Sequence, residues 1–263
     1  MNDIKKQKGW FFPKIGGGTE EGFNHAGIQT FGAEPDHYLP RETIQNSLDA
    51  KDPSKKNEPV VVEFKRFKVP IEHAIPNLPE YIEILKKCKE SCAEQTDKKG
   101  KIFFTNALAV CKNKNITVLK ISDYGTTGIE KINKNVGRWH NLIKMKGTSV
   151  AEGKSGGTYG IAKSAPYITS GLRTLFYYTK NKDGNCGFIW KSIFTAHDNN
   201  PKRGNEGFYC HSFEHEEEII TEGFTDNNQQ NLIERTVNGT DIIILDHQFE
   251  QKKGDQPWNI FYE

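Results

Sequence analysis

The sequence has no apolar run approaching the roughly 20 residues that a transmembrane helix needs, and its polar N-terminus has no apolar signal-peptide core. Its five cysteines are an odd number and include no C-x-x-C pair that would indicate a zinc site. The formal net charge is only +2, which gives no indication of nucleic-acid binding. We therefore expect a globular protein with free thiols in a reducing, cytoplasmic setting and no membrane partner.

The chain is long enough for one large domain or two small ones. With 263 residues, of which 35% are hydrophobic and 27% charged, it can bury a substantial core. Residues 1–37 are rich in glycine and aromatic side chains and are predicted to form an irregular N-terminal arm, with dimer exchange as a role to test. Residues 38–263 are predicted to form the main domain.

A helix is predicted over "PRETIQNSLDAK", residues 40–51. Pro40 suits a first helical turn, and Ile44 and Leu48 share one apolar face. That face is expected to contact the core.

The other predicted elements are mainly strands, separated by one inserted helical region at about 70–114. Alternating or β-branched and aromatic residues predict strands within 60–69, 115–123, 172–180, 186–197 and 240–246. Helices gathered early and strands gathered late indicate an α+β sandwich. We expect a mixed, mostly antiparallel sheet covered on one face by helices.

Three polar side chains, Glu42, Asn46 and Asp49, fall on one side of the predicted helix. Residues three and four apart share a helix face. A carboxylate can take a proton from water, and an amide oxygen is a hard ligand suited to Mg²⁺. A solvated helix face has the same pattern, so these residues alone leave both interpretations open.

The stretch "GTSVAEGKSGGTYGIAKSA", residues 147–165, raises the question of phosphate binding. A P-loop has four residues between its glycines, whereas five separate Gly147 from Gly153. The preceding residues are too polar for a buried strand, and Gly156 and Gly157 follow where a P-loop requires a helix. The glycines instead precede a helix-compatible stretch, which is typical of a backbone anion site.

Two more candidates lie at strand ends. Asp123 follows a predicted strand and precedes Gly125 and Gly128, and Thr240 opens a strongly apolar strand. The first pattern is either a simple turn or a carboxylate that accepts from a ring amine, with glycines leaving room for the ring.

In this order, the motifs resemble those of the GHKL (Bergerat-fold) ATPase superfamily. The sequence has E-x-x-x-N-x-x-D on a helix, D-x-G after a strand, G-G-x-x-G in a loop and G-T opening a strand, within about residues 38–246. The stretch "RETIQNSLDA" is closest in style to the MutL, MORC and heat-shock chaperone branches. Two departures are an extra residue in D-x-G-x-x-G, where the family has D-x-G-x-G, and Ala162 where many members have a third glycine.

The resemblance implies a Bergerat-type sandwich that binds ATP and Mg²⁺. It implies Glu42 as the general base for water attack on the γ-phosphate and Asn46 as the Mg²⁺ ligand. Asp123 would accept from the adenine amino group, with Asp49 and Thr240 in the surrounding network. The remaining implied contacts, which line the pocket or cradle the phosphates, are Gly125, Gly128, Ile129, Gly156, Gly157, Thr158, Tyr159, Gly160 and Ile161.

The implied activity is slow Mg²⁺-dependent ATP hydrolysis, in which a lid at about 130–157 closes and drives dimerisation or the action of a partner protein. Many dimeric members contact the γ-phosphate with a lysine from a following domain. Because little sequence follows Thr240, we expect the N-terminal part of a larger machine or a different activation. The alternative is an ATP-sensing interaction module without appreciable turnover.

A histidine-kinase domain is disfavoured, because Glu42 is present and no helix with a phosphoacceptor histidine precedes it. Conformational ATPases in DNA repair, chromatin compaction, chaperoning and antiphage defence would share these motifs, since the process is set by attached domains.

Overall fold

The computed structural model describes residues 6–24, 28, 35–132, 134, 136–145, 164–198, 201–213, 232–233 and 235–248. Within them, one seven-stranded sheet has the order β1-β6-β5-β4-β7-β3-β2, and its pairings are antiparallel. The strands are β1 (Lys6–Phe11), β2 (Val61–Pro70), β3 (Asn115–Tyr124), β4 (Thr174–Lys180), β5 (Cys186–Ile193), β6 (Glu206–Phe213) and β7 (Gly239–Leu245). The α+β class is confirmed, although the described sheet is antiparallel throughout and not mixed.

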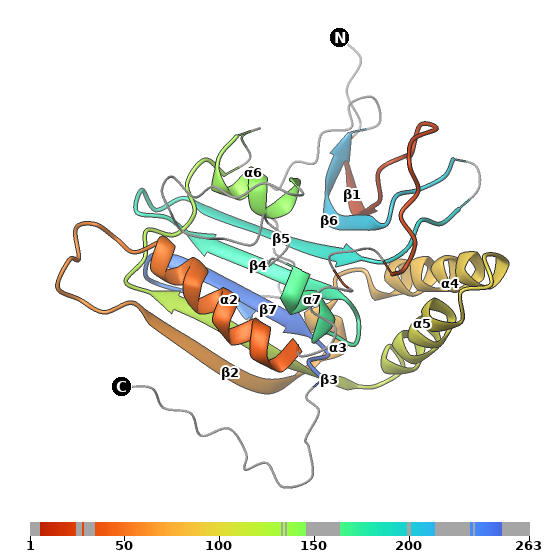
Figure 1. Ribbon diagram of the computed structural model, residues 1–263, viewed down its shortest axis with the longest axis horizontal. Coiled ribbons are helices and arrows are strands. Elements are labelled where there is room, and N and C mark those ends of the chain that lie inside the picture. The colour runs from red at the N-terminus through yellow and green to blue at the C-terminus, as the bar shows by residue number, and fades with distance from the viewer. Residues whose placement is uncertain are drawn as a thin grey trace, which may run out of the picture.

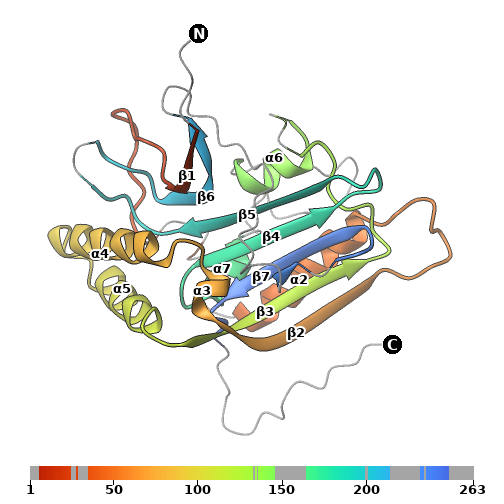
Figure 2. The ribbon, with the colours of Figure 1, turned by 180° about the vertical axis from the view of Figure 1, so that it is seen from behind.

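Helices lie on both faces of this sheet. The described helices are α2 (Pro35–Asp49), α3 (Ile71–Ala74), α4 (Leu78–Glu94), α5 (Lys98–Val110), α6 (Arg138–Ile143) and α7 (Ala165–Ile168). Helices α2 and α7 lie over one face (Figure 1), whereas α3 lies over the other and α4 and α5 gather at one end (Figure 2). The helical insertion expected between β2 and β3 is present, and it covers part of the face that was expected to be free of helices. None of the described helices is long and apolar enough to cross a bilayer.

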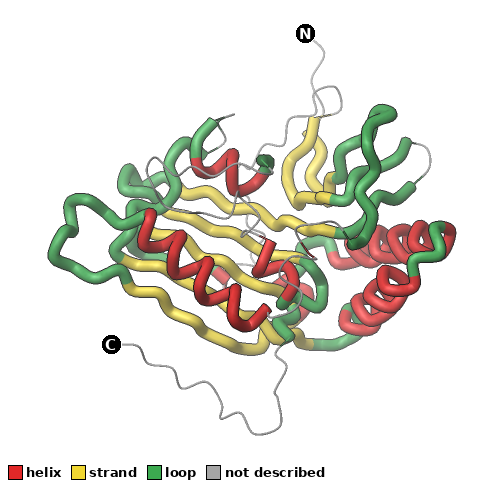
Figure 3. The backbone as a smooth tube through the Cα atoms, in the orientation of Figure 1, coloured by secondary structure: helices red, strands yellow, loops and turns green. Residues whose placement is uncertain are grey.

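Each face of the sheet has its own hydrophobic core, because successive strand residues point to opposite sides. In β4, Leu175 and Tyr177 pack in the core on the α2 side, whereas Phe176 and Tyr178 pack in the core shared with α3, α4 and α5. The layers are visible in Figure 3, where the sheet lies behind α2. The nearly continuous apolar run of β4 therefore reflects burial on both faces.

Helix α2 buries a different face from the one that its aliphatic residues predict. Thr43 and Ser47 are buried, whereas Leu48 is 51% exposed. The hydroxyls of Thr43 and Ser47 donate to carbonyl oxygens one turn earlier, those of Leu39 and Thr43, at 2.8 and 2.9 Å. These bonds give both buried hydroxyl groups a hydrogen-bond acceptor, so the small polar side chains can face the protein interior. The prediction that Ile44 and Leu48 mark the core face is therefore wrong.

Two segments differ from prediction in extent. Helix α2 begins at Pro35, so Pro40 lies inside it and not in its first turn. Either proline is compatible with a helix start, and the helix uses the earlier one. Residues 6–11, expected to be irregular, form β1 and pair with β6 of the same chain. Exchange of this arm between copies stays a prediction.

Candidate functional site

Asp123 is the last residue but one of β3, and its carboxylate lies on the α2 side of the sheet. It shares this side with Leu119 and Ile121, which belong to the α2-side core. The residue is only 9% exposed. Its Oδ1 accepts hydrogen bonds from the Thr126 hydroxyl at 2.6 Å and from the Thr240 backbone N–H at 2.8 Å. Among the described residues none donates to Oδ2, so this oxygen is available to a ligand donor.

Burial raises the pKa of Asp123 above the ordinary aspartate value, because the charged form loses hydration. The hydrogen bonds from Thr126 and Thr240 and the positive charge of Arg235 lower the pKa, but they do not outweigh the burial. A donor from a ligand would therefore stabilise a carboxylate that the protein alone stabilises incompletely.

Thr240 contacts Asp123 through its backbone N–H and not through its hydroxyl. The Thr240 hydroxyl instead lies 3.1 Å from the hydroxyl of Thr179 in β4. The Thr179 hydroxyl accepts from the N–H of Ile129 at 2.9 Å and donates to the carbonyl of Gly239 at 3.1 Å. Thr179 is fully buried and thus joins the segment after Asp123 to the start of β7.

Sequence reasoning missed both Thr179 and Thr126. A single threonine in a strand or turn has no periodic signal, and its role becomes visible only when the strands pair. Thr126 lies three residues after Asp123, inside the turn pattern D-x-G-x-x-G. Of the two threonines, only Thr126 could have been selected from that pattern.

Gly125 and Gly128 both have backbone conformations that favour glycine, with φ of 74° and 66°. A Cβ at Gly125 would lie 2.8 Å from the carbonyl oxygen of Pro59, and one at Gly128 would overlap the carbonyl oxygen of Lys180. The turn after β3 therefore needs both glycines for its own packing, before any ligand is considered.

The segment that directly follows α2 is joined to this turn by two backbone hydrogen bonds. The N–H of Asp52 donates to the carbonyl of Gly125 at 2.9 Å, and the N–H of Thr127 donates to the carbonyl of Ala50 at 3.1 Å. The first and second sequence motifs are therefore neighbours in space.

Glu42, Asn46 and Asp49 lie along one flank of α2, Glu42 half-buried and the other two exposed. The Asp49 carboxylate accepts from Gln45 at 3.0 Å, and the Asp49 carbonyl accepts from Arg138 of α6 at 3.2 Å. Within the described parts of the chain, no hydrogen bond engages the side chain of Glu42 or Asn46. Their carboxylate and amide are thus available to water, a cation or phosphate.

A cation at Asn46 would share its coordination shell with groups other than the carboxylates that the structure describes. In the described part of the chain, no three His, Cys, Asp or Glu side chains gather to hold a metal ion. Mg²⁺ commonly keeps several waters and takes phosphate oxygens beside one or two protein ligands. The amide of Asn46 fits that kind of shared shell.

The predicted phosphate cradle lies outside the described residues. These residues are Gly156, Gly157, Thr158, Tyr159, Gly160 and Ile161, and half of the predicted lid at 130–157 lies outside the described residues with them. The described part of the lid includes α6, whose Trp139 and Ile143 pack in the α2-side core. The structure thus brings together three of the four motifs.

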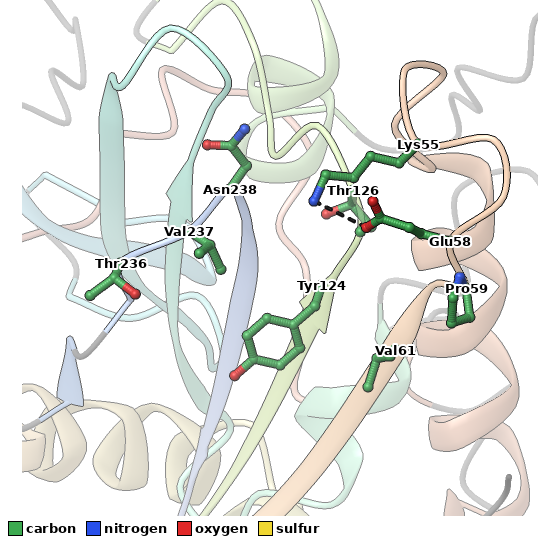
Figure 4. A pocket seen from close by; sticks show the side chains of 10 residues that line it. Lys55, Glu58, Pro59, Val61, Tyr124, Thr126, Thr236, Val237 and Asn238 are labelled. Carbon is green, nitrogen blue, oxygen red and sulfur yellow. Dashed lines mark ion pairs between the residues drawn. The ribbon is translucent and has the colours of Figure 1, made fainter.

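A cavity of about 570 Å³ opens beside the same turn (Figure 4). Its lining residues are Lys55, Glu58, Pro59, Val61, Tyr124, Gly125, Thr126, Thr236, Val237 and Asn238. Tyr124 follows Asp123 directly in β3, so the two side chains point to opposite faces of the sheet. The Asp123 carboxylate therefore points away from the Tyr124 side of this cavity, although the cavity shares Gly125 and Thr126 with the predicted nucleotide site.

No protein-family model and no curated protein matches this sequence. Membership of the GHKL superfamily stays a prediction from the motifs.

Proposed function

We propose that this chain binds ATP with Mg²⁺ in a GHKL-type site on the α2 side of the sheet and hydrolyses it slowly. One observation carries the proposal: the end of α2, the turn after β3 and the start of β7 are joined by hydrogen bonds around the buried Asp123 carboxylate. These segments are far apart in the sequence, and each contains one of the family's motifs.

The adenine end of the proposed site depends on Asp123. Thr126 and Thr240 already engage Oδ1, which leaves Oδ2 to accept from an exocyclic amino group. Guanine has a carbonyl oxygen in the corresponding position, which would place an acceptor against an acceptor. The site therefore favours ATP over GTP.

The phosphate end depends on the flank of α2. Asn46 would hold Mg²⁺ together with phosphate oxygens and water, and the ion would neutralise phosphate charge. Glu42, one turn earlier, would accept the proton of the attacking water. By the resemblance, backbone amides of residues 156–161 would bind the phosphates.

Lid closure that drives dimerisation or the action of a partner protein is part of the proposal. The Arg138 contact with the Asp49 carbonyl connects α6, which lies within the predicted lid, to the helix that bears Glu42 and Asn46. Movement of α6 would thereby affect the catalytic helix.

A second candidate is an ATP-sensing module without appreciable turnover. It is favoured by the side chain of Glu42, which no described residue orients by a hydrogen bond. A general base works best when it is held in place by a neighbour.

Binding is tested by calorimetric titration of the protein with ATP and with GTP in the presence of Mg²⁺. We expect ATP to bind at least about tenfold more tightly, because a site built to accept from an amino group rejects a carbonyl. Equal affinities for the two nucleotides would contradict the role of Asp123.

Turnover is tested by phosphate release from wild type, Glu42→Gln and Glu94→Gln. Glu94 is exposed at the end of α4 and serves as the matched control. Loss of a general base typically costs about 10²–10⁴-fold, so Glu42→Gln should fall to background while Glu94→Gln stays at the wild-type rate. Equal rates in all three proteins would favour the sensor.

A further inference from the structure

We infer that Arg235 is a positioning residue for the nucleotide site: from the far face of the sheet, it fixes the turn whose backbone N–H orients Asp123. The inference rests on the proposed function of this site and adds a residue that belongs to none of the four motifs.

Arg235 holds the backbone on both sides of Gly239. It donates to the carbonyl of Asn238 and to the carbonyl of Thr240, each at 3.1 Å. Its Nε and a terminal nitrogen also donate to Oδ1 of Asp241, at 3.1 and 2.6 Å. The Arg235 side chain is 2% exposed and that of Asp241 is 1% exposed, so water does not compete for these bonds.

Arg235 and Asp123 bond to consecutive peptide groups of the same turn from opposite faces of the sheet. Asp241 lies opposite Ser122 in the β3–β7 pair and therefore points away from the Asp123 carboxylate. The guanidinium also lies 4.9 Å from the ring centroid of Tyr124, the neighbour of Asp123. Both strands that meet at the site are thus held by one side chain.

The turn depends on such a constraint, because its backbone is unusual. Gly239 has φ of 143°, a conformation that favours glycine. A Cβ there would overlap the Arg235 guanidinium and the carbonyl oxygen of Asp123. Without the guanidinium, the carbonyls of Asn238 and Thr240 would lose their donors, and the Thr240 N–H would no longer be held against Asp123.

A purely structural role for Arg235 is the competing explanation, and Arg173 provides the matched control. Arg173 is also buried, donates to the carbonyl of Phe23 at 2.8 Å and lies 3.6 Å from the Phe23 ring centroid. It precedes β4, at the opposite end of that strand from Thr179. Replacing either arginine removes a buried guanidinium with an aromatic contact, so both variants should lose stability.

The test compares ATP affinity in wild type, Arg235→Met and Arg173→Met, at a temperature where circular dichroism shows each protein to be folded. We expect Arg235→Met to weaken ATP binding by about 5- to 30-fold, which lies within the range for residues coupled through a shared contact. Arg173→Met should bind ATP as wild type does.

A pH profile adds a readout that a purely structural role would not change. The charge of Arg235 lowers the pKa of Asp123, so its removal should shift the acid-side loss of ATP affinity to higher pH. If Arg235→Met does not fold, Arg235→Lys replaces it, since lysine keeps the charge but lacks the fork that spans both carbonyls. It should show a weaker affinity without that pH shift.

Wild-type affinity in the folded Arg235 variant, or an equal loss in Arg173→Met, would overturn the inference and leave the proposed function intact. Failure of the wild-type protein to bind ATP would instead overturn the proposed function.

Discussion

Replacing Gly128 by alanine tests how closely the turn after β3 packs against the end of β4. Gly128 and Gly184 both have positive φ, 66° and 80°, so alanine is strained at either position. A Cβ at Gly128 would overlap the carbonyl oxygen of Lys180 and lie 3.0 Å from Cα of Asn181. A Cβ at Gly184, in the β4–β5 turn, would meet nothing within 4 Å. The two substitutions therefore share the strain but not the clash.

The left-handed conformation costs an alanine about 1–2 kcal/mol at either site. Forcing an extra carbon against packed backbone adds about 1–3 kcal/mol, and only in Gly128→Ala. We expect the free energy of unfolding to fall by about 2–5 kcal/mol in Gly128→Ala and by about 1–2 kcal/mol in Gly184→Ala.

Urea denaturation, followed by tryptophan fluorescence and circular dichroism, gives both values if the slopes with denaturant agree. Gly128→Ala should also weaken ATP binding, because a displaced turn would pull the Ile129 N–H away from Thr179. Equal losses of stability in the two variants would refute the close approach of the turn to β4.

Three further substitutions have expected outcomes. Burial raises the pKa of Asp123, so the ionised residue costs stability that is recovered when it is protonated. Asp123→Asn should melt higher than wild type at pH 7, and the gain should shrink as the pH falls through the raised pKa and be lost by about pH 4, the ordinary aspartate value. If the stability difference between Asp123→Asn and wild type grew on acidification, the pKa of Asp123 would not be raised by folding. Thr179→Val should lose about 1–3 kcal/mol in urea denaturation, because it leaves the half-buried N–H of Ile129 without its acceptor. Thr105→Val, at an exposed position of α5, should lose under about 0.5 kcal/mol, and similar losses in the two variants would refute the bridging role of Thr179. Lys191→Met should lose about 3 kcal/mol, because it removes a buried partner 2.9 Å from Glu206, and a loss under about 1 kcal/mol would show that the pair is not stabilising.

Much of the fold could be predicted from local patterns. The strands with β-branched and aromatic residues, such as β3, β4 and β7, are long enough for their periodicity to be clear. Asp123 was found because it ends one of these strands and is followed by glycines that the turn requires. Its partner Thr240 was found from the order of motifs along the chain.

The remaining features depend on contacts between distant segments. The buried face of α2 is set by Thr43 and Ser47, whose hydroxyls bond within the helix, and hydrophobicity alone assigns them to the surface. Thr179 gains its role only when β4 pairs with β7. The Arg235 contacts depend on the unusual backbone at Gly239.

The proposed site is tested most directly by titrating wild type, Asp123→Asn and Asp183→Asn with ATP and Mg²⁺ in a calorimeter. Asp183 is exposed in the β4–β5 turn, so its variant controls for the loss of a negative charge. In Asp123→Asn, the amide oxygen can still accept from Thr126 and Thr240, which turns an N–H₂ group toward the adenine amino group. We predict a loss of about 2–3 kcal/mol, or about 30- to 150-fold in affinity, in Asp123→Asn only. Unchanged ATP affinity in Asp123→Asn would contradict the account.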